Sequence, residues 1–196
     1  ARRAAFNAFM SYCQQMMGIQ EQDPSKAVEF IRSLLQPTVD ARVFEIVSYA
    51  VLKQYYSDQQ LYWGWSPDAL NVEYLVLFKT GRTNANDGGI DFVMKPLGRF
   101  FQVTETIDAG KYFLDIDKVQ RYPITFVVKT EETVDGVVEK IEQQAKDRYK
   151  VKAVVKRYMD SIEEVINLPE LLKRLDHVLE RGKGKDMIED IVLQSR

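Results

Sequence analysis

The stretch that decides the fold is residues 88–105, which read GGIDFVMKPLGRFFQVTE. Pro suits the second position of a β-turn and Gly the fourth, so Pro96-Leu97-Gly98 predicts a tight connection between two strands. We place these strands at Ile90–Lys95 and Arg99–Glu105. The stretch therefore predicts a β-hairpin whose second strand begins directly after the turn.

Two oxygen-bearing side chains are expected to meet on this hairpin. Side chains of a strand alternate between its faces, so an even number of loop residues puts Asp91 and Gln102 on the same face. A two-residue loop would place them directly opposite each other. A four-residue loop would place Asp91 opposite Thr104, with Gln102 diagonal to it. Either register brings Asp91 and Gln102 together.

This pair is a candidate metal site. Mg²⁺ prefers oxygen ligands and is usually held by one or two carboxylates together with waters and phosphate. The Asp91 carboxylate, the Gln102 side-chain oxygen and the Val103 carbonyl would supply such ligands, and Mn²⁺ would substitute for Mg²⁺. The alternative is that Asp91 caps a turn after Gly88-Gly89 and that Gln102 is an ordinary polar strand residue.

Helices and further strands are expected on both sides of the hairpin. Asp23-Pro24 predicts an N-cap followed by Pro at the first helical position. Ile124–Val128 is a short apolar run typical of a buried central strand. The other expected elements are helices at 6–17, 24–36, 38–56 (capped by Thr38) and 112–119, an aromatic-rich connector at 55–65, a strand at 72–78, and helices from residue 133 onward. We therefore expect an α/β (α+β) fold in which helices cover a mixed central sheet.

Length and composition are those of a globular protein. The 196 residues suffice for one domain with a sizeable core. We expect an N-terminal helical extension at 1–37, an α/β core at 38–130 and a C-terminal helical region at 131–196 packed on that core. No run approaches the roughly 20 apolar residues that a membrane span needs. Cys13 is the only cysteine, which excludes an internal disulfide and fits a cytoplasmic protein.

The charge balance makes a general affinity for nucleic acid unexpected. The formal net charge is −2, so DNA binding would require basic residues clustered on one face. Two stretches are candidates for DNA contact. One is the polar loop that carries Arg82, Asn84 and Asn86, and the other is the basic run that carries Lys146, Arg148, Lys150 and Lys152. The alternative for the basic run is an ordinary solvated helix face.

Taken together, Gly88–Val93 and the segment Gln102-Val103-Thr104, with ten residues between Asp91 and Gln102, resemble the PD-(D/E)xK nuclease superfamily. This superfamily includes restriction endonucleases, Mrr-like enzymes and Holliday-junction resolvases. Its signature is Asp on one strand, then Glu, Asp or Gln, any residue, and Lys on the next strand. A preceding helix often carries a Glu, as Phe44-Glu45 does here. The resemblance extends over about residues 39–130, and the order of the expected elements also fits.

The resemblance implies a restriction endonuclease-like fold and a metal-dependent endonuclease that hydrolyses double-stranded DNA. Asp91, Gln102, Thr104 and Glu45 would be its catalytic residues, with Mg²⁺ held by Asp91, Gln102 and Val103. Cutting both strands needs two sites, so a homodimer is implied. For Glu45, an ion pair with Arg42 three residues earlier on the helix is an equally good explanation.

One residue departs from the signature, because Thr104 stands where the superfamily has Lys. Three residues are considered as replacements. Lys95 shares the face of Asp91 but is about 13 Å away along the strand. Glu105 points to the opposite face, and Lys79 lies near the end of the strand before the loop. The alternatives are a catalytically inactive DNA-binding or assembly module on the same fold, or a helical interaction protein in which the hairpin is only structural.

Overall fold

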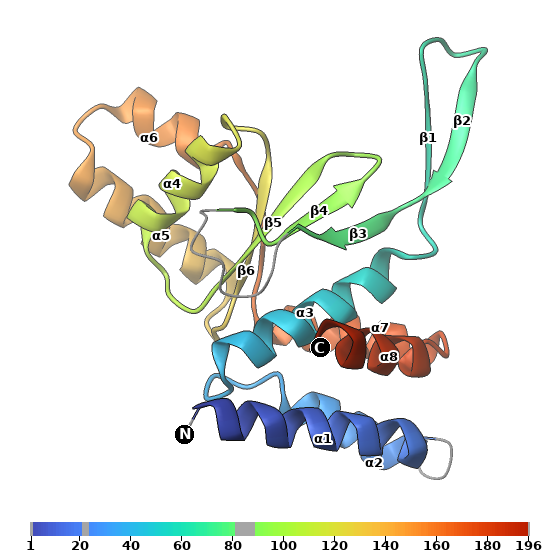
Figure 1. The fold of residues 1–196 in the computed structure, drawn as a ribbon. Coiled ribbons are helices and arrows are strands. Elements are labelled where there is room, and N and C mark those ends of the chain that lie inside the picture. Colours follow the sequence, from blue (N-terminus) through green and yellow to red (C-terminus); the bar gives the residue numbers. More distant parts are fainter. Residues whose placement is uncertain (1, 21–23, 81–88, 196) are drawn as a thin grey trace.

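A five-stranded mixed sheet forms the centre of the molecule (Figure 1). The structure is a computed structural model, and it describes residues 2–20, 24–80 and 89–195. The strand order is β3-β4-β5-β6-β7, with β3, β4 and β5 antiparallel and β5, β6 and β7 parallel. The strands are β3 (Val76–Lys79), β4 (Phe92–Lys95), β5 (Arg99–Thr104), β6 (Ile124–Val128) and β7 (Ile162–Ile166).

The predicted hairpin is strands β4 and β5. Phe92 lies opposite Phe101 and Met94 opposite Arg99. The next strand, β6, is buried along its whole length and lies between β5 and β7, so the prediction of a buried central strand is confirmed. The mixed α/β class is confirmed as well.

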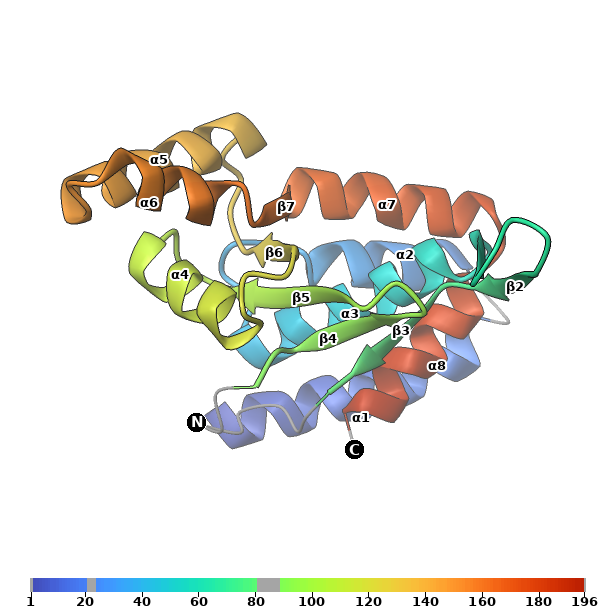
Figure 2. The ribbon, with the colours of Figure 1, turned by 90° about the horizontal axis from the view of Figure 1, so that it is seen from above.

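Helices cover the sheet on both faces (Figure 2). One face packs against α3 (Ala41–Tyr56), α7 (Leu168–Glu180) and α8 (Gly184–Gln194), and α1 (Arg2–Gln20) and α2 (Pro24–Ser33) lie beyond them. The other face packs against α4 (Ala109–Lys118), α5 (Val134–Arg148) and α6 (Lys152–Met159). Because side chains alternate along a strand, β6 sends Val127 into one core and Phe126 into the other.

Helix α3 lies directly under the sheet and carries Glu45. Its N-cap is Asp40, whose side chain accepts a hydrogen bond of 2.9 Å from the Arg42 backbone N–H. The predicted cap at Thr38 is therefore wrong by two residues. The Tyr49 hydroxyl donates to the Leu77 carbonyl at 3.0 Å, which ties this helix to β3.

The prediction that the chain is helical from residue 133 onward is wrong at β7. Ile162-Glu163-Glu164-Val165-Ile166 pairs with β6 and forms an edge of the sheet. Two consecutive glutamates disfavour a strand by intrinsic propensity, but pairing with a neighbouring strand overrides such preferences. The C-terminal region thus contributes a strand to the sheet as well as helices.

A second, two-stranded sheet projects from the body of the molecule (Figure 1). Strands β1 (Gln60–Gly64) and β2 (Leu70–Tyr74) form it where the sequence predicted a connector and a single strand at 72–78. Trp65 at its tip is 97% exposed and Tyr62 is 61% exposed. The aromatic residues of this hairpin therefore lie on the surface, whereas Tyr56 at the end of α3 is buried.

None of the helices within the described ranges has both the length and the apolar character needed to cross a membrane.

Candidate metal centre

Asp91 and Gln102 occupy one end of the β4–β5 hairpin. The observed register, continued one step beyond Phe92 and Phe101, is the one predicted for a two-residue loop and puts Asp91 opposite Gln102. Asp91 immediately precedes β4, and its Oδ2 accepts a hydrogen bond of 2.7 Å from the Val103 backbone N–H. The Thr80 N–H donates to the Asp91 carbonyl at 3.0 Å, which connects this position to the end of β3.

The Gln102 side chain presents a buried oxygen at this position. Its Oε1 is out of contact with solvent and accepts no hydrogen bond from any residue that the structure describes. A buried acceptor without a donor costs on the order of 1–3 kcal/mol. A bound cation would supply the missing interaction, so the observation agrees with the interpretation of Gln102 as a metal ligand.

Glu45 reaches the same end of the sheet from α3. Its Oε1 is 2.9 Å from Lys79 Nζ, and the Glu45 and Lys79 side chains are 15% and 8% exposed. Arg42, the partner considered from the sequence, instead places its guanidinium carbon 3.8 Å from the centre of the Phe6 ring. Glu45 is therefore an ion-pair partner of Lys79, and its negative charge also acts on Asp91.

The surroundings of Asp91 disfavour its ionised form. The pKa of Asp91 is raised to about 7, mainly by burial and to a smaller extent by the negative charges of Glu45 and Asp115. The Val103 N–H and the positive charge of Lys79 act in the opposite direction. This excess of negative charge at a half-buried carboxylate is what a divalent cation would neutralise.

Sequence reasoning did not single out Asp115, which comes from the covering helix α4. It pairs with Lys118 at 2.8 Å, and its side chain is 14% exposed. An acidic residue on a predicted amphipathic helix carries no signal of its own. Its position beside the hairpin follows only from the packing of α4 on the sheet.

Thr104, the residue that departs from the signature, is part of a local turn. Its hydroxyl donates to the Thr106 carbonyl at 3.1 Å and accepts from the Thr106 N–H at 3.3 Å. Of the three possible replacements, Lys95 lies across from Val76 at the far end of β4, and Glu105 pairs with Lys129. Lys79 alone among them acts on the charge of Asp91.

The residues expected to contact DNA fall into three groups. Lys146, Lys150 and Lys152 line a common pocket at the junction of α5 and α6. Arg148 does not line it, since its guanidinium lies against Gly110 at the start of α4. Arg82, Asn84 and Asn86 lie outside the described residues.

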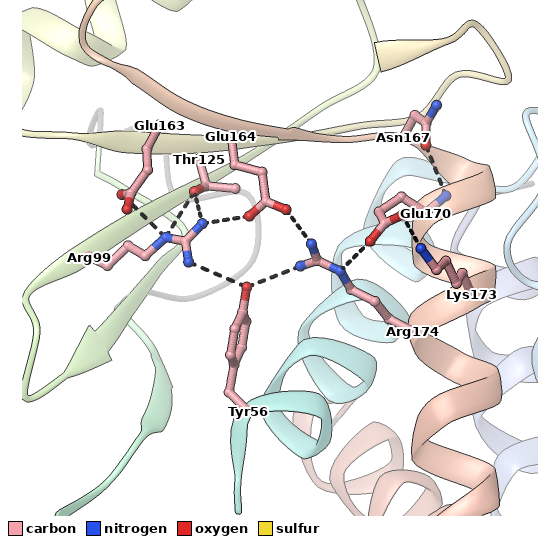
Figure 3. A network of polar contacts seen from close by, with 9 residues as sticks. All are labelled: Tyr56, Arg99, Thr125, Glu163, Glu164, Asn167, Glu170, Lys173 and Arg174. Atoms are coloured by element: carbon pink, nitrogen blue, oxygen red, sulfur yellow. Dashed lines mark hydrogen bonds and ion pairs between the residues drawn. The ribbon is translucent and has the colours of Figure 1, made fainter. Parts of the chain in front are cut away.

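A second polar cluster, which sequence reasoning missed, lies at the opposite end of β5 (Figure 3). Arg99 donates to Thr125 at 2.9 and 3.1 Å and to Glu164 at 2.5 Å. Arg174 of α7 donates to the Tyr56 hydroxyl at 3.0 Å, to Glu170 at 3.0 Å and to Glu164. This network joins α3, β5, β6, β7 and α7, and each of its two guanidinium groups has a carboxylate partner.

The composition of the candidate centre limits the kind of metal that it suits. The part of the chain that the structure describes contains no group of three or more His, Cys, Asp or Glu side chains arranged to hold a metal ion. A centre at Asp91 would thus combine one carboxylate with neutral oxygens, which suits a hard cation that retains waters, such as Mg²⁺, and not a thiolate- or imidazole-bound metal.

Comparisons with known proteins assign no family to this chain. Neither models of protein families, nor curated proteins, nor solved structures match this chain significantly.

Proposed function

We propose that this protein is a metal-dependent endonuclease of the PD-(D/E)xK type that hydrolyses phosphodiester bonds of double-stranded DNA with Mg²⁺. The observation that carries the proposal is the buried Gln102 Oε1, which lacks a donor among the described residues. The β4–β5 register, continued by one residue, puts Gln102 across from Asp91. A metal ion would interact with the Gln102 oxygen in place of a donor, and it would neutralise the excess negative charge at Asp91.

The connectivity of the sheet supports the same proposal. Helix α3 is followed by the antiparallel strands β3, β4 and β5, then by α4 and by β6, which is parallel to β5. This is the order of elements that the resemblance implies, so we propose a restriction endonuclease-like fold extended by β7 and the flanking helices.

In this proposal, the metal would be held by Asp91, the Gln102 side chain and the Val103 carbonyl. Mg²⁺ would supply an activated water and offset charge on the phosphodiester. The Val103 N–H orients the Asp91 carboxylate through its 2.7 Å hydrogen bond. Glu45 holds the ammonium group of Lys79 at 2.9 Å, close enough to lower the pKa of Asp91. We propose that Lys79 provides the positive charge that Lys supplies at the position of Thr104 in the superfamily.

A catalytically inactive DNA-binding or assembly module is the second candidate function. The observation that favours it is the engagement of the Thr104 hydroxyl in a turn, which leaves the usual catalytic position without a charged group. In that case the metal centre would support binding or folding and would not promote hydrolysis.

The decisive experiment is cleavage of plasmid and phage DNA with Mg²⁺ or Mn²⁺ by the native protein and by Asp91→Asn. We expect fragments with the native protein and none with the variant. Asp186→Asn is the matched control, because Asp186 is an exposed acid on α8, away from the hairpin. Retained DNA binding without cleavage by either protein would favour the inactive module. If neither protein cleaves or binds DNA, a role in DNA chemistry is rejected.

A second set of variants tests the role of Lys79. Lys79→Met should reduce the cleavage rate by a factor of about 10² or more, which is typical for the loss of one charge-stabilising group. Adding Thr104→Lys to Lys79→Met should restore part of that rate by returning the lysine to its usual strand. Lys173→Met, at a side chain that is 82% exposed, is the control. Unchanged cleavage by Lys79→Met would remove Lys79 from the mechanism.

A further inference from the structure

A pocket at the junction of α5 and α6 has no role in the proposed cleavage site. It encloses about 590 Å³, within the range of roughly 300–1,000 Å³ that is usual for small-molecule sites. Its lining consists of four lysines, one acid, one aromatic and one apolar residue: Lys146, Lys150, Lys152, Lys156, Glu142, Tyr149 and Val155.

The charge of this lining is strongly positive. Glu142 pairs with Lys146 at 2.8 Å, and Asp160 outside the pocket pairs with Lys156 at 2.5 Å. Lys150 and Lys152 form no ion pair with any residue in the described ranges. Lys150 and Lys152 are exposed residues of the lining, and an anionic ligand in the pocket would offset their positive charge. The pocket is therefore suited to a group with several negative charges.

An aromatic wall completes the pocket. Tyr149 is half-buried, and its ring centre lies 5.7 Å from that of Phe113 and 5.9 Å from that of Tyr158. Phe113 and Tyr158 belong to the core between α4, α5 and α6, so they hold the Tyr149 ring in place. The guanidinium carbon of Arg148 lies 5.8 Å from the centre of the same ring. The part of Tyr149 that lines the pocket offers a contact surface for a flat ring attached to the anion.

We propose that this pocket binds a nucleotide, with its phosphates on Lys150 and Lys152 and its base against Tyr149. Two sources supply this chemistry, namely a free nucleoside triphosphate and a phosphorylated end of a nucleic acid strand. The proposal does not depend on cleavage at Asp91, because the two sites share no residue.

The test is calorimetric titration of the full chain, without divalent metal, with ATP, with inorganic triphosphate and with a 5′-phosphorylated single-stranded oligonucleotide. Lys150→Gln/Lys152→Gln should weaken ATP binding at least tenfold. Lys140→Gln/Lys173→Gln removes the same charge from exposed lysines outside the pocket and should leave it unchanged. Tyr149→Phe should bind ATP like the native protein, and Tyr149→Leu should lose affinity for ATP but not for inorganic triphosphate.

Comparing ATP with the oligonucleotide distinguishes a free nucleotide from a strand end. ATP binding without oligonucleotide binding would assign a free nucleotide, and oligonucleotide binding that requires the 5′-phosphate would assign a strand end. Equal weakening by the two lysine pairs would overturn the proposal, because it would reveal only a general charge effect. Absence of binding by all three ligands at millimolar concentration would overturn it as well. Asp91→Asn should bind ATP normally even if the cleavage proposal fails.

Discussion

The two polar clusters at the ends of β5 differ in how completely their groups are paired. At the start of β5, the guanidinium groups of Arg99 and Arg174 each contact Glu164, and both approach the Tyr56 hydroxyl (Figure 3). Near its other end, Gln102 Oε1 has no donor within the described part of the chain, and Asp91 faces a surplus of negative charge.

This difference indicates that the first cluster stabilises the fold, whereas the second is a candidate binding site. Buried charges are tolerated when each has a partner, and the first cluster meets that condition while it joins α3, β7 and α7. The second cluster leaves a buried acceptor and a carboxylate in an unfavourable state, which lowers the stability of the protein without a ligand. Such an arrangement is expected at binding sites, where a ligand provides the missing interactions.

The largest effect is expected from breaking the paired cluster. Arg174→Met should lower the free energy of unfolding by about 3 kcal/mol. It removes the guanidinium group that contacts Glu170 and the Tyr56 hydroxyl, and it leaves Glu164 with Arg99 alone. Urea denaturation measures this loss. Lys173→Met is the control, because its side chain is 82% exposed and its loss should change stability by less than about 0.5 kcal/mol. A loss below about 1 kcal/mol for Arg174→Met would show that the network is dispensable.

A gain in the free energy of unfolding is expected instead from a substitution in the incomplete cluster, which consists of Asp91 and Gln102. Without metal, Asp91→Asn should raise the free energy of unfolding by roughly 2 kcal/mol at pH 8. This is less than the whole pKa shift of Asp91 would give, because Asp91 is only partly buried. The unfolded chain ionises Asp91 near pH 4, whereas the folded protein retains the proton up to a pKa of about 7. The native protein therefore loses stability relative to Asp91→Asn as the pH rises between these values.

Denaturation at pH 4.5 and at pH 8 distinguishes this cause from a change in packing. The difference between the two proteins should nearly vanish at the lower pH and be largest at the higher one. Mg²⁺ at pH 8 should raise the melting temperature of the native protein and not that of Asp91→Asn. A constant difference at both pH values would contradict the electrostatic explanation.

The sequence predicted the incomplete cluster better than the complete one. Asp91 and Gln102 lie eleven positions apart on one hairpin, so strand alternation and a short turn suffice to bring them together. Arg99 and Glu164 are 65 positions apart, and their contact depends on β7. This strand was not predicted, because its two consecutive glutamates have low strand propensity. Long-range pairing of this kind leaves no periodic signal. Lys79 and Asp115 likewise reach the centre through tertiary packing.

A smaller loss is expected from removing only the hydroxyl of the paired cluster. Tyr56→Phe deletes the acceptor that Arg174 contacts at 3.0 Å and keeps the buried ring, so it should cost about 1.5 kcal/mol, as for a hydrogen bond to a charged group. Thermal and urea denaturation measure it. Tyr62→Phe, at an exposed hairpin position, is the matched control and should be neutral. Equal stabilities of Tyr56→Phe and the native protein would show that Arg99 and Arg174 are satisfied by their other partners, Thr125, Glu164 and Glu170.

The smallest change is expected from Gln102→Met, which removes the buried oxygen and preserves most of the side-chain volume. Eliminating an acceptor that has no donor in the described structure should leave the free energy of unfolding unchanged or raise it by up to about 1 kcal/mol. The same substitution should abolish most of the Mg²⁺-induced rise in melting temperature. A marked loss of stability without metal would mean that Gln102 is already paired, and the contrast between the two ends of β5 would then disappear.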